Sequence, residues 1–145
     1  GNEAPGAATW GVSNRSALVR VPTYRLTKEE SRRVEIRSID ASMNPYLGYA
    51  VILAAGLRGI REGYELDEPA EDDVHQLTHR ERRAMGYKDL PSSMDQALRE
   101  FEKSEFMAEV LGEHVFEFFL RAKWEEWRDY QRQITTVELR NNLNF

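Results

Sequence analysis

Two short stretches near the start of the chain have patterns of apolar and polar residues that are typical of β-strands. Residues 1–14 are rich in Gly, Ala, Asn and Pro and predict a loop. Residues 17–21 are aliphatic and β-branched and end at Pro22, while residues 33–37 alternate strictly between charged and apolar side chains. Both patterns predict β-strands, and their closeness in the chain is compatible with an antiparallel pair.

A long apolar stretch after these strands predicts a helix. Asn44 can cap its start, and Pro45 suits the first helical position, where no backbone N–H is needed. The helix is expected to run to about Glu62 and to stop at Gly63. Its first dozen or so residues are apolar on nearly every side, which predicts a buried helix rather than an amphipathic one.

The rest of the chain reads as an acidic loop followed by amphipathic helices. Residues 63–91 are acidic and irregular, with a short helical stretch near 80–85, and Ser92 precedes Asp95 at capping-box spacing. One helical face then carries Met94, Ala97, Leu98 and Phe101.

A further helix over about 113–133 has a buried stripe, and residues 135–145 read as a short polar tail. The stripe consists of Phe116, Leu120, Trp124 and Trp127. Strands first and helices after predict an α+β fold with a small antiparallel β portion of two to three strands and a mainly helical C-terminal half. The expected segments are 1–40 (loop and strands), 44–62 (buried helix), 63–91 (acidic loop), 92–134 (helices) and 135–145 (tail).

Composition removes several classes of function. The chain has 145 residues, 41% of them hydrophobic and 31% charged, which is typical of one globular domain. It contains no cysteine, so disulfides, thiolate nucleophiles and cysteine zinc sites are excluded. The longest apolar run, residues 46–57, is too short to span a bilayer, and no signal-peptide pattern opens the chain. A net charge of −5 argues against general nucleic-acid binding.

The charge is unevenly distributed along the chain. Residues 1–37 hold seven basic and four acidic residues, a net +3, which leaves −8 for the remainder. A basic start on an acidic protein suggests a local anion site. The alternative is a chance segregation of charge on a solvated surface.

The strand over residues 33–37 carries the strongest candidate chemistry. Side chains two apart share a face, so Arg33, Glu35 and Arg37 point one way, while Val34 and Ile36 point toward a core. Two guanidinium groups beside a carboxylate could hold a phosphate together with a divalent metal. Weak ion pairing on a solvent-exposed sheet face is the alternative.

Arg15 and Arg20 form a second basic pair. In a regular strand they would point to opposite faces, so they converge only if residues 14–16 are still loop. Otherwise they are charges on a strand edge that discourage aggregation. His75 and His79 have the spacing of metal ligands on one helix face, but they and His114 are better explained as surface histidines.

Three stretches together resemble the glutamine synthetase family, in particular the C-terminal part of the catalytic domain of bacterial type I, actinobacterial-like members. The resemblance covers the whole chain and is most specific over its first 60 or so residues. It rests on Glu3-Ala4-Pro5, on Asn14-Arg15-Ser16 through Arg20-Val21-Pro22, and on Arg32-Arg33-Val34-Glu35-Ile36-Arg37 followed by Asp40 and Asn44-Pro45-Tyr46-Leu47. Leu90-Pro91-Ser92-Ser93 and the later helices match more loosely.

The resemblance implies a role for five residues. Glu3 resembles the catalytic flap glutamate that helps to deprotonate ammonium. Arg15 and Arg20 resemble arginines that bind the ATP phosphates, and Arg15 is also implied in phosphoryl transfer. Glu35 resembles a ligand of the metal between the phosphates, and Arg37 resembles the catalytic arginine that faces the transferring phosphoryl group.

The resemblance also implies a reaction. A longer parent enzyme, a cytoplasmic ligase of glutamine biosynthesis and nitrogen metabolism, would use ATP and Mg²⁺ or Mn²⁺ to join glutamate and ammonium through γ-glutamyl phosphate. Family members assemble as ring dodecamers, and no nucleic-acid or membrane partner is expected. The family's other metal ligands would precede Gly1, so the chain alone is expected to be inactive. The alternatives are a fragment of a ligase for a larger amine, such as a polyamine, and a non-catalytic oligomerisation module.

One departure concerns regulation. Residues 72–77 match the stretch that carries the adenylylated tyrosine in regulated bacterial members, and His75 stands in its place. The resemblance therefore does not support that switch in this chain.

Overall fold

The computed structural model describes residues 4–24, 27 and 29–143. They divide into two compact units, residues 1–92 and residues 93–145. Among the described residues, no helix combines the length and the apolar character that a membrane crossing requires.

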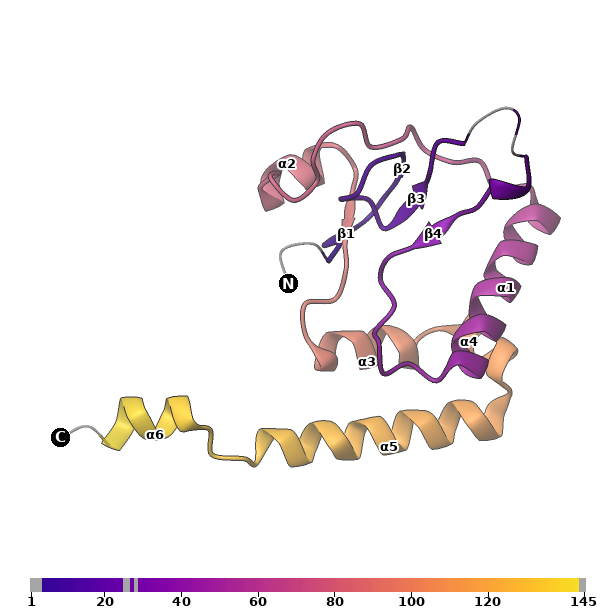
Figure 1. Cartoon of the computed structure of the whole chain (residues 1–145). Helices are drawn as coiled ribbons and strands as arrows, with labels where there is room; N and C mark the ends of the chain where they lie inside the picture. The colour runs from indigo at the N-terminus through magenta and orange to yellow at the C-terminus, as the bar shows by residue number, and fades with distance from the viewer. Residues whose placement is uncertain (1–3, 25–26, 28, 144–145) are drawn as a thin grey trace. The chain divides into compact units, whose positions relative to one another are not determined.

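Two small sheets organise the first unit (Figure 1). In one, β1 (Ala7–Ala8) pairs antiparallel with β5 (Lys88–Asp89). In the other, β3 (Val19–Val21) lies between β2 (Trp10–Val12) and β4 (Glu35–Ile36). β3 runs parallel to β2 and antiparallel to β4, and a short 3₁₀ helix, η1 (Glu29–Ser31), precedes β4.

The two predicted strands are therefore present, though shorter than expected, and their antiparallel pairing is confirmed. Val34 was expected to face a core, but this expectation is wrong for the described chain. It lies just before β4 and is 60% exposed, because the alternation ends where the two-residue strand begins. Ile36, which pairs with Val19 across the ladder, is half-buried.

Small side chains form the core of the first unit. Ala7 from β1 packs with Ala70 and Val74 from the acidic segment, and Tyr87 covers this cluster from the side. Val74 is the largest fully buried side chain among the described residues. Such a core removes little apolar surface from water, so hydrogen bonds must contribute much of the order in this unit.

Helix α1 (Pro45–Glu62) has the predicted bounds. The Asn44 side chain accepts hydrogen bonds from the backbone N–H groups of Tyr46 (3.0 Å) and Leu47 (3.4 Å). Gly63 ends the helix with a left-handed φ of 65°, a conformation that glycine adopts without strain.

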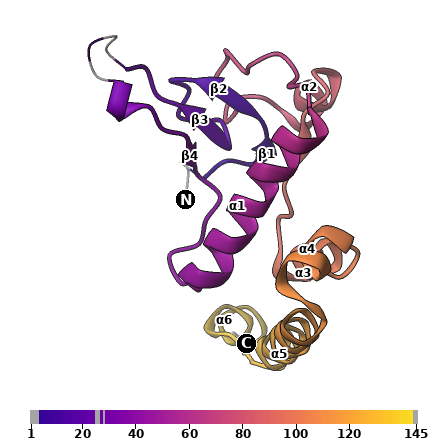
Figure 2. The ribbon, with the colours of Figure 1, turned by 90° about the vertical axis from the view of Figure 1, so that its right-hand side faces the viewer.

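The expected burial of α1 is not found in the described chain. No residue of the helix is buried, and Tyr46 and Ile60 are 85% and 81% exposed. Figure 2 shows α1 as a continuous helix in the first unit. An apolar helix is expected to pack against another apolar surface. The described residues of the first unit do not bury any residue of α1.

The acidic segment after α1 contains one short helix. α2 (His79–Ala84) begins with a reciprocal capping box, in which Thr78 and Glu81 each bond the other's backbone N–H. The sequence predicted this helix within one residue at each end. It did not predict β5, whose two exposed residues carry no hydrophobic alternation.

In the part of the second unit that the structure describes, residues 93–143, there are four helices: α3 (Met94–Glu102), α4 (Glu105–Leu111), α5 (Glu113–Gln131) and α6 (Thr136–Leu143). α5 packs against both α3 and α4. Leu98 of α3 is buried, and the Phe101 ring stacks on Phe116 of α5 with centroids 4.9 Å apart. The predicted stripe of α5 is thus half-buried against α3.

Two predicted details of this unit are wrong. Ser93 rather than Ser92 caps α3, and its hydroxyl accepts from the backbone N–H of Gln96 at 3.2 Å. The expected polar tail is helical, because Thr135 and Glu138 form a capping box at its start.

Candidate functional site

The β3–β4 ladder brings an arginine and a carboxylate of the predicted site together. Arg20 and Glu35 are paired residues in the ladder, and Arg20 Nη1 lies 2.8 Å from Glu35 Oε2. Arg33 Nη2 lies 3.3 Å from the other oxygen, Oε1. Glu35 is therefore bound on both oxygens by guanidinium groups. The hydrogen bond from Arg20 is the main reason that the pKa of Glu35 lies below its ordinary value.

Within the described chain, Arg20 also has an unpaired hydrogen-bond donor, its Nε–H group. Its side chain is 20% exposed, and its Nε is buried and has no hydrogen-bond partner among the described residues. A buried guanidinium N–H without a partner is costly, and an anionic oxygen brought to this site would satisfy it. This donor set fits a phosphate group.

Arg15 lies in the loop between β2 and β3. Residues 14–16 are outside any strand, so the condition under which Arg15 and Arg20 can converge is met. The Arg15 side chain is exposed and makes no hydrogen bond or ion pair with any other residue that the structure describes. Arg37 is half-buried, and its backbone N–H donates to the carbonyl of Leu18 at 2.9 Å, which holds it beside the strand that carries Arg20.

The remaining predicted residues lie apart from this face. Glu3 falls outside the described residues. His75 and His114 are exposed, and His79 Nδ1 lies 2.8 Å from Asp89 Oδ2. Over the described ranges, no three His, Asp or Glu side chains gather closely enough to hold a metal ion.

Glu35 alone has the chemistry of a metal ligand at this face. Magnesium prefers carboxylate oxygens in six-fold coordination, so one carboxylate fits only as part of a larger ligand set. The residues that could hold ATP and a metal are thus Arg15, Arg20 and Arg37 for phosphate, and Glu35 for the metal.

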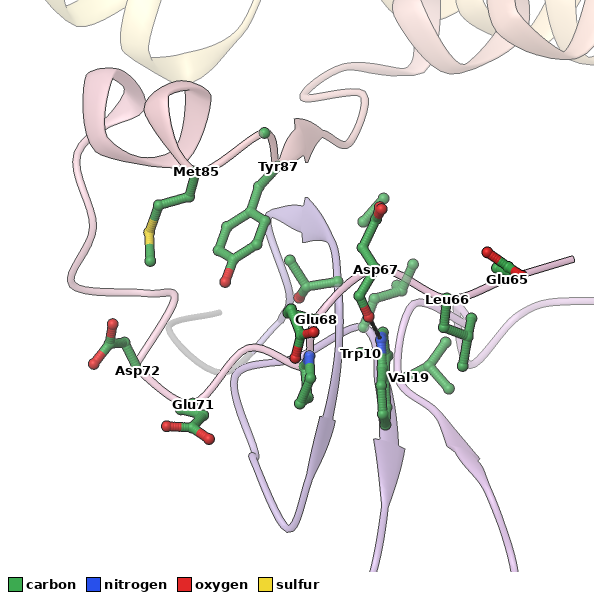
Figure 3. Close-up of a pocket in the computed structure, with 15 residues that line it drawn as sticks. Trp10, Val19, Glu65, Leu66, Asp67, Glu68, Glu71, Asp72, Met85 and Tyr87 are labelled. Carbon is green, nitrogen blue, oxygen red and sulfur yellow. Dashed lines mark hydrogen bonds between the residues drawn. The ribbon is translucent and has the colours of Figure 1, made fainter.

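A cavity of the first unit lies elsewhere. It has a volume of about 1010 Å³, and Figure 3 shows Trp10 and Tyr87 among the residues that line it. Five acidic residues line it: Glu65, Asp67, Glu68, Glu71 and Asp72. Such a lining repels a triphosphate, and none of the predicted arginines takes part in it. The arginine–carboxylate face is therefore the better candidate for a phosphate site.

Sequence reasoning missed a hydrogen-bond network beside Arg15. Asn14 Nδ2 donates to the carbonyls of Ala70 (2.7 Å) and Asp72 (2.9 Å), and the backbone N–H of Val74 donates to Ser16 Oγ at 2.8 Å. The only signal in the sequence was the presence of two hydrogen-bonding side chains on either side of Arg15, which does not reveal a partner more than fifty residues away.

A small sheet that carries phosphate-compatible arginines and a metal-compatible carboxylate, followed by helices, fits the class of nucleotide-binding domains. Comparison with known proteins makes this more specific. Residues 1–142 match the model of the glutamine synthetase catalytic domain. Glutamine synthetases of Mycobacterium bovis and Mycolicibacterium smegmatis are 61% and 58% identical over 144 residues, and that of Thermotoga maritima is 39% identical over 143.

The chain belongs to the glutamine synthetase family. Each of these alignments covers 99% of the chain but 32% of the relative, so the chain spans about a third of the length of the curated relatives it matches. A solved structure of apo GmaS without ligand is 31% identical, with a TM-score of 0.75 over 98% of this chain and 31% of that one. This match supports the α+β fold seen here.

Proposed function

We propose that this chain supplies phosphate-binding arginines and one metal-ligating carboxylate to the active site of a longer ATP-dependent glutamate–ammonia ligase. The observation that carries the proposal is the cross-strand pair of Arg20 and Glu35, which holds a guanidinium and a carboxylate side by side. The family of the chain supports the same reaction.

Each proposed role is one that the resemblance to the family implies and that the chemistry of the side chain fits. Arg20, with its spare buried Nε, binds ATP phosphate oxygens, and Arg15 approaches the same phosphates from its exposed loop. Glu35 contributes one ligand of a Mg²⁺ or Mn²⁺ ion. Arg37 faces the phosphoryl group in transfer, and Glu3 acts at the flap that closes over glutamate and ammonium.

The proposed reaction has two displacements. The γ-carboxylate of glutamate attacks the γ-phosphorus of ATP, releasing ADP and forming γ-glutamyl phosphate, and ammonia then displaces phosphate to give glutamine. Phosphoryl transfer depends on positioned positive charge more than on a nucleophilic side chain. The arginines of this chain provide such charge, and Glu3 would help to remove the proton from ammonium.

The chain by itself is expected to be inactive, because one carboxylate cannot complete the coordination of the ions. The proposed enzyme is cytoplasmic, where its ATP is available, and assembles as a ring-shaped homo-oligomer. A measurable ATP-dependent turnover by the isolated chain would contradict the expected inactivity.

The test uses the full-length protein that contains this chain. Phosphate release is measured with glutamate and ATP, and either ammonium or a panel of larger amines is offered as acceptor. Selective stimulation by ammonium supports the proposal. Stimulation only by larger amines would support instead a ligase for another amine, which would use the same phosphate and metal residues.

Variants of the same protein test the site. Replacing Glu35 or Arg37 with Ala should lower the rate by at least about 100-fold, because positioned charge is removed from the transition state. Lys103→Ala is the control, since it removes a charge from an exposed ion pair with Glu100 on another unit. Near-normal activity of either site variant would show the assignment to be wrong.

A further inference from the structure

Asn14 joins the loop of Arg15 to the acidic segment of the first unit. Its side-chain Nδ2 donates to the carbonyl oxygens of Ala70 at 2.7 Å and Asp72 at 2.9 Å. Its Oδ1 accepts from the backbone N–H of Ser16 at 2.9 Å and from the Ser16 hydroxyl at 2.7 Å. All four hydrogen-bonding positions of the amide are thus used, and a flipped amide would set its oxygen against two carbonyls.

Ser16 completes the link from the other side of Arg15. Its hydroxyl donates to Asn14 and accepts from the backbone N–H of Val74 at 2.8 Å. Three backbone groups of residues 70–74 are therefore held by the two residues that flank Arg15. We call this set of bonds, made by Asn14 and Ser16 to residues 70–74, the loop clamp.

Much of the loop clamp is shielded from solvent. Ser16 is 4% exposed, and Ala70 and Val74 are each 2% exposed, so water competes little for the bonds at these residues. The bond from Asn14 to the carbonyl of Asp72 is exposed. The backbones also approach closely, since a Cβ added to Gly11 would lie 2.7 Å from the carbonyl oxygen of Ala70. The backbone N–H of Ala70 donates to the carbonyl of Trp10 at 2.8 Å, which extends the contact along β2.

Arg15 itself has no such anchor. Its side chain is exposed and makes no hydrogen bond to another described residue, so the place of its guanidinium depends on the backbone that carries it. That backbone is fixed by the residues immediately before and after it. A conformational change of residues 70–74 would therefore move Arg15.

We propose that Asn14 and Ser16 are positioning residues, which hold Arg15 in place for the ATP phosphates by clamping its loop to residues 70–74. This inference rests on the proposed function, because it takes Arg15 to be a phosphate ligand. The acidic segment then acts as the support of a catalytic loop, and ATP affinity and the order of residues 70–74 are coupled.

The first experiment measures kinetics of the full-length protein. Asn14→Ala should raise the KM for ATP and lower kcat, with a loss in kcat/KM for ATP of about 10- to 100-fold, because a displacement of about 1 Å at a positioning group has effects of this size. The KM for glutamate should change less than twofold. Unchanged constants for ATP, or an equal rise in KM for every substrate, would overturn the proposal.

Two further variants test whether the two donors of the Asn14 amide are responsible. Asn14→Asp keeps the size of the side chain and the acceptor for Ser16, but it replaces the two donors with a charged oxygen facing two carbonyls, so its loss should be at least as large as that of Asn14→Ala. Ser13→Ala is the matched control in the same loop. Among the described residues, Ser13 Oγ forms hydrogen bonds only with Thr23. A loss in Ser13→Ala as large as that in Asn14→Asp would count against the loop clamp.

Amide hydrogen exchange tests the loop clamp without any activity. Ser16→Ala, the mildest change, should increase the exchange rate of the Val74 amide at least tenfold, while the amides of α5 keep their rates. An unchanged Val74 rate would overturn the proposal even if the kinetics agreed. If the wild-type protein lacks ligase activity, the proposed function fails, and an increased Val74 rate would then show the clamp but not its catalytic role.

Discussion

The internal structure of the first unit and that of the second unit are stabilised by different kinds of interaction. In the first unit the buried apolar residues are small, and β2, the loop of Arg15 and the acidic segment are joined by hydrogen bonds across long separations in the sequence. In the second unit the helices are capped locally, and large side chains such as Phe101 and Phe116 pack between them. The predicted phosphate ligands all lie in the first unit.

This contrast offers a physical reason for the location of the proposed phosphate-binding face in the first unit. Hydrogen bonds are directional and fix a backbone to within fractions of an ångström, whereas apolar packing tolerates exchange of similar shapes. A unit that must present arginines at defined positions gains from an ordered network of hydrogen bonds. A unit that serves mainly as a packed scaffold needs only apolar packing.

The largest expected effect on stability is a cavity in the second unit. Leu98→Ala should lower the free energy of unfolding by about 3 kcal/mol, because the leucine is buried where α3 packs on α5. Val74→Ala in the first unit should cost less, about 2 kcal/mol, since two carbon atoms rather than three are removed from the buried side chain. Urea unfolding followed by tryptophan fluorescence measures both, with Trp124 and Trp127 reporting on the second unit and Trp10 on the first. A larger cost for Val74 would contradict the contrast.

The substitution of a closely packed glycine should have the next largest effect on the free energy of unfolding. In Gly11→Ala the new methyl group would meet the Ala70 carbonyl at 2.7 Å and Asn14 Cβ at 2.9 Å. We expect a loss of about 2 kcal/mol, within the usual range for overpacking. Gly56→Ala is the matched control, because nothing lies within 4 Å of its added Cβ and alanine favours the helix interior. A neutral Gly11→Ala would show that β2 and the acidic segment can separate without cost.

Removal of a helix cap should have a smaller effect. Ser93→Ala deletes the hydroxyl that accepts from the Gln96 N–H, and it should destabilise the second unit by about 1 kcal/mol. Ser93→Gly should cost only a few tenths of this, since glycine is tolerated at the position. Thermal unfolding monitored by circular dichroism compares the two, and equal losses would argue against the cap.

The smallest expected effect is on the pH dependence of stability at acidic pH. Because the Arg20 hydrogen bond lowers the pKa of Glu35 in the folded state, the pair stabilises the protein at pH values above the ordinary glutamate pKa of 4.5. This contribution is lost as the pH falls through the lowered, folded-state pKa. Glu35→Gln should therefore be less stable than wild type near neutral pH and should lose less on acidification. Parallel acid unfolding curves would show that the ion pair contributes nothing.

Local signals in the sequence predicted the helices well. Asn44, Pro45 and Gly63 define both ends of α1, because capping and glycine conformations depend only on neighbouring residues. The strict alternation around Glu35 predicted β4, and the pairing of β3 with β4 followed from their closeness in the chain. Helix α6 was missed although Thr135 and Glu138 have capping-box spacing, since its polar composition suggested a tail.

Features that depend on distant residues could not be read in this way. The Ala-Ala and Lys-Asp strands carry no hydrophobic period, so nothing in the sequence indicates that β1 pairs with β5. The loop clamp joins Asn14 and Ser16 to residues 70–74, and hydrogen bonds between such polar groups have no periodic signature. The exposure of α1 depends on which surface meets it, which its own residues do not specify.

The pairing of β1 with β5 has a consequence for the order in which the chain folds. Its register joins Ala7 to Asp89, so this two-stranded sheet closes a loop that contains nearly the whole first unit. Contacts this distant form slowly, because the entropy of closing the loop is lost before the contact is gained. The helices of the second unit, by contrast, contact near neighbours in sequence and can form early. On the ribosome, the arginines proposed to bind phosphate would emerge before residue 89, but the sheet of β1 and β5 could be completed only after residue 89 had left the exit tunnel.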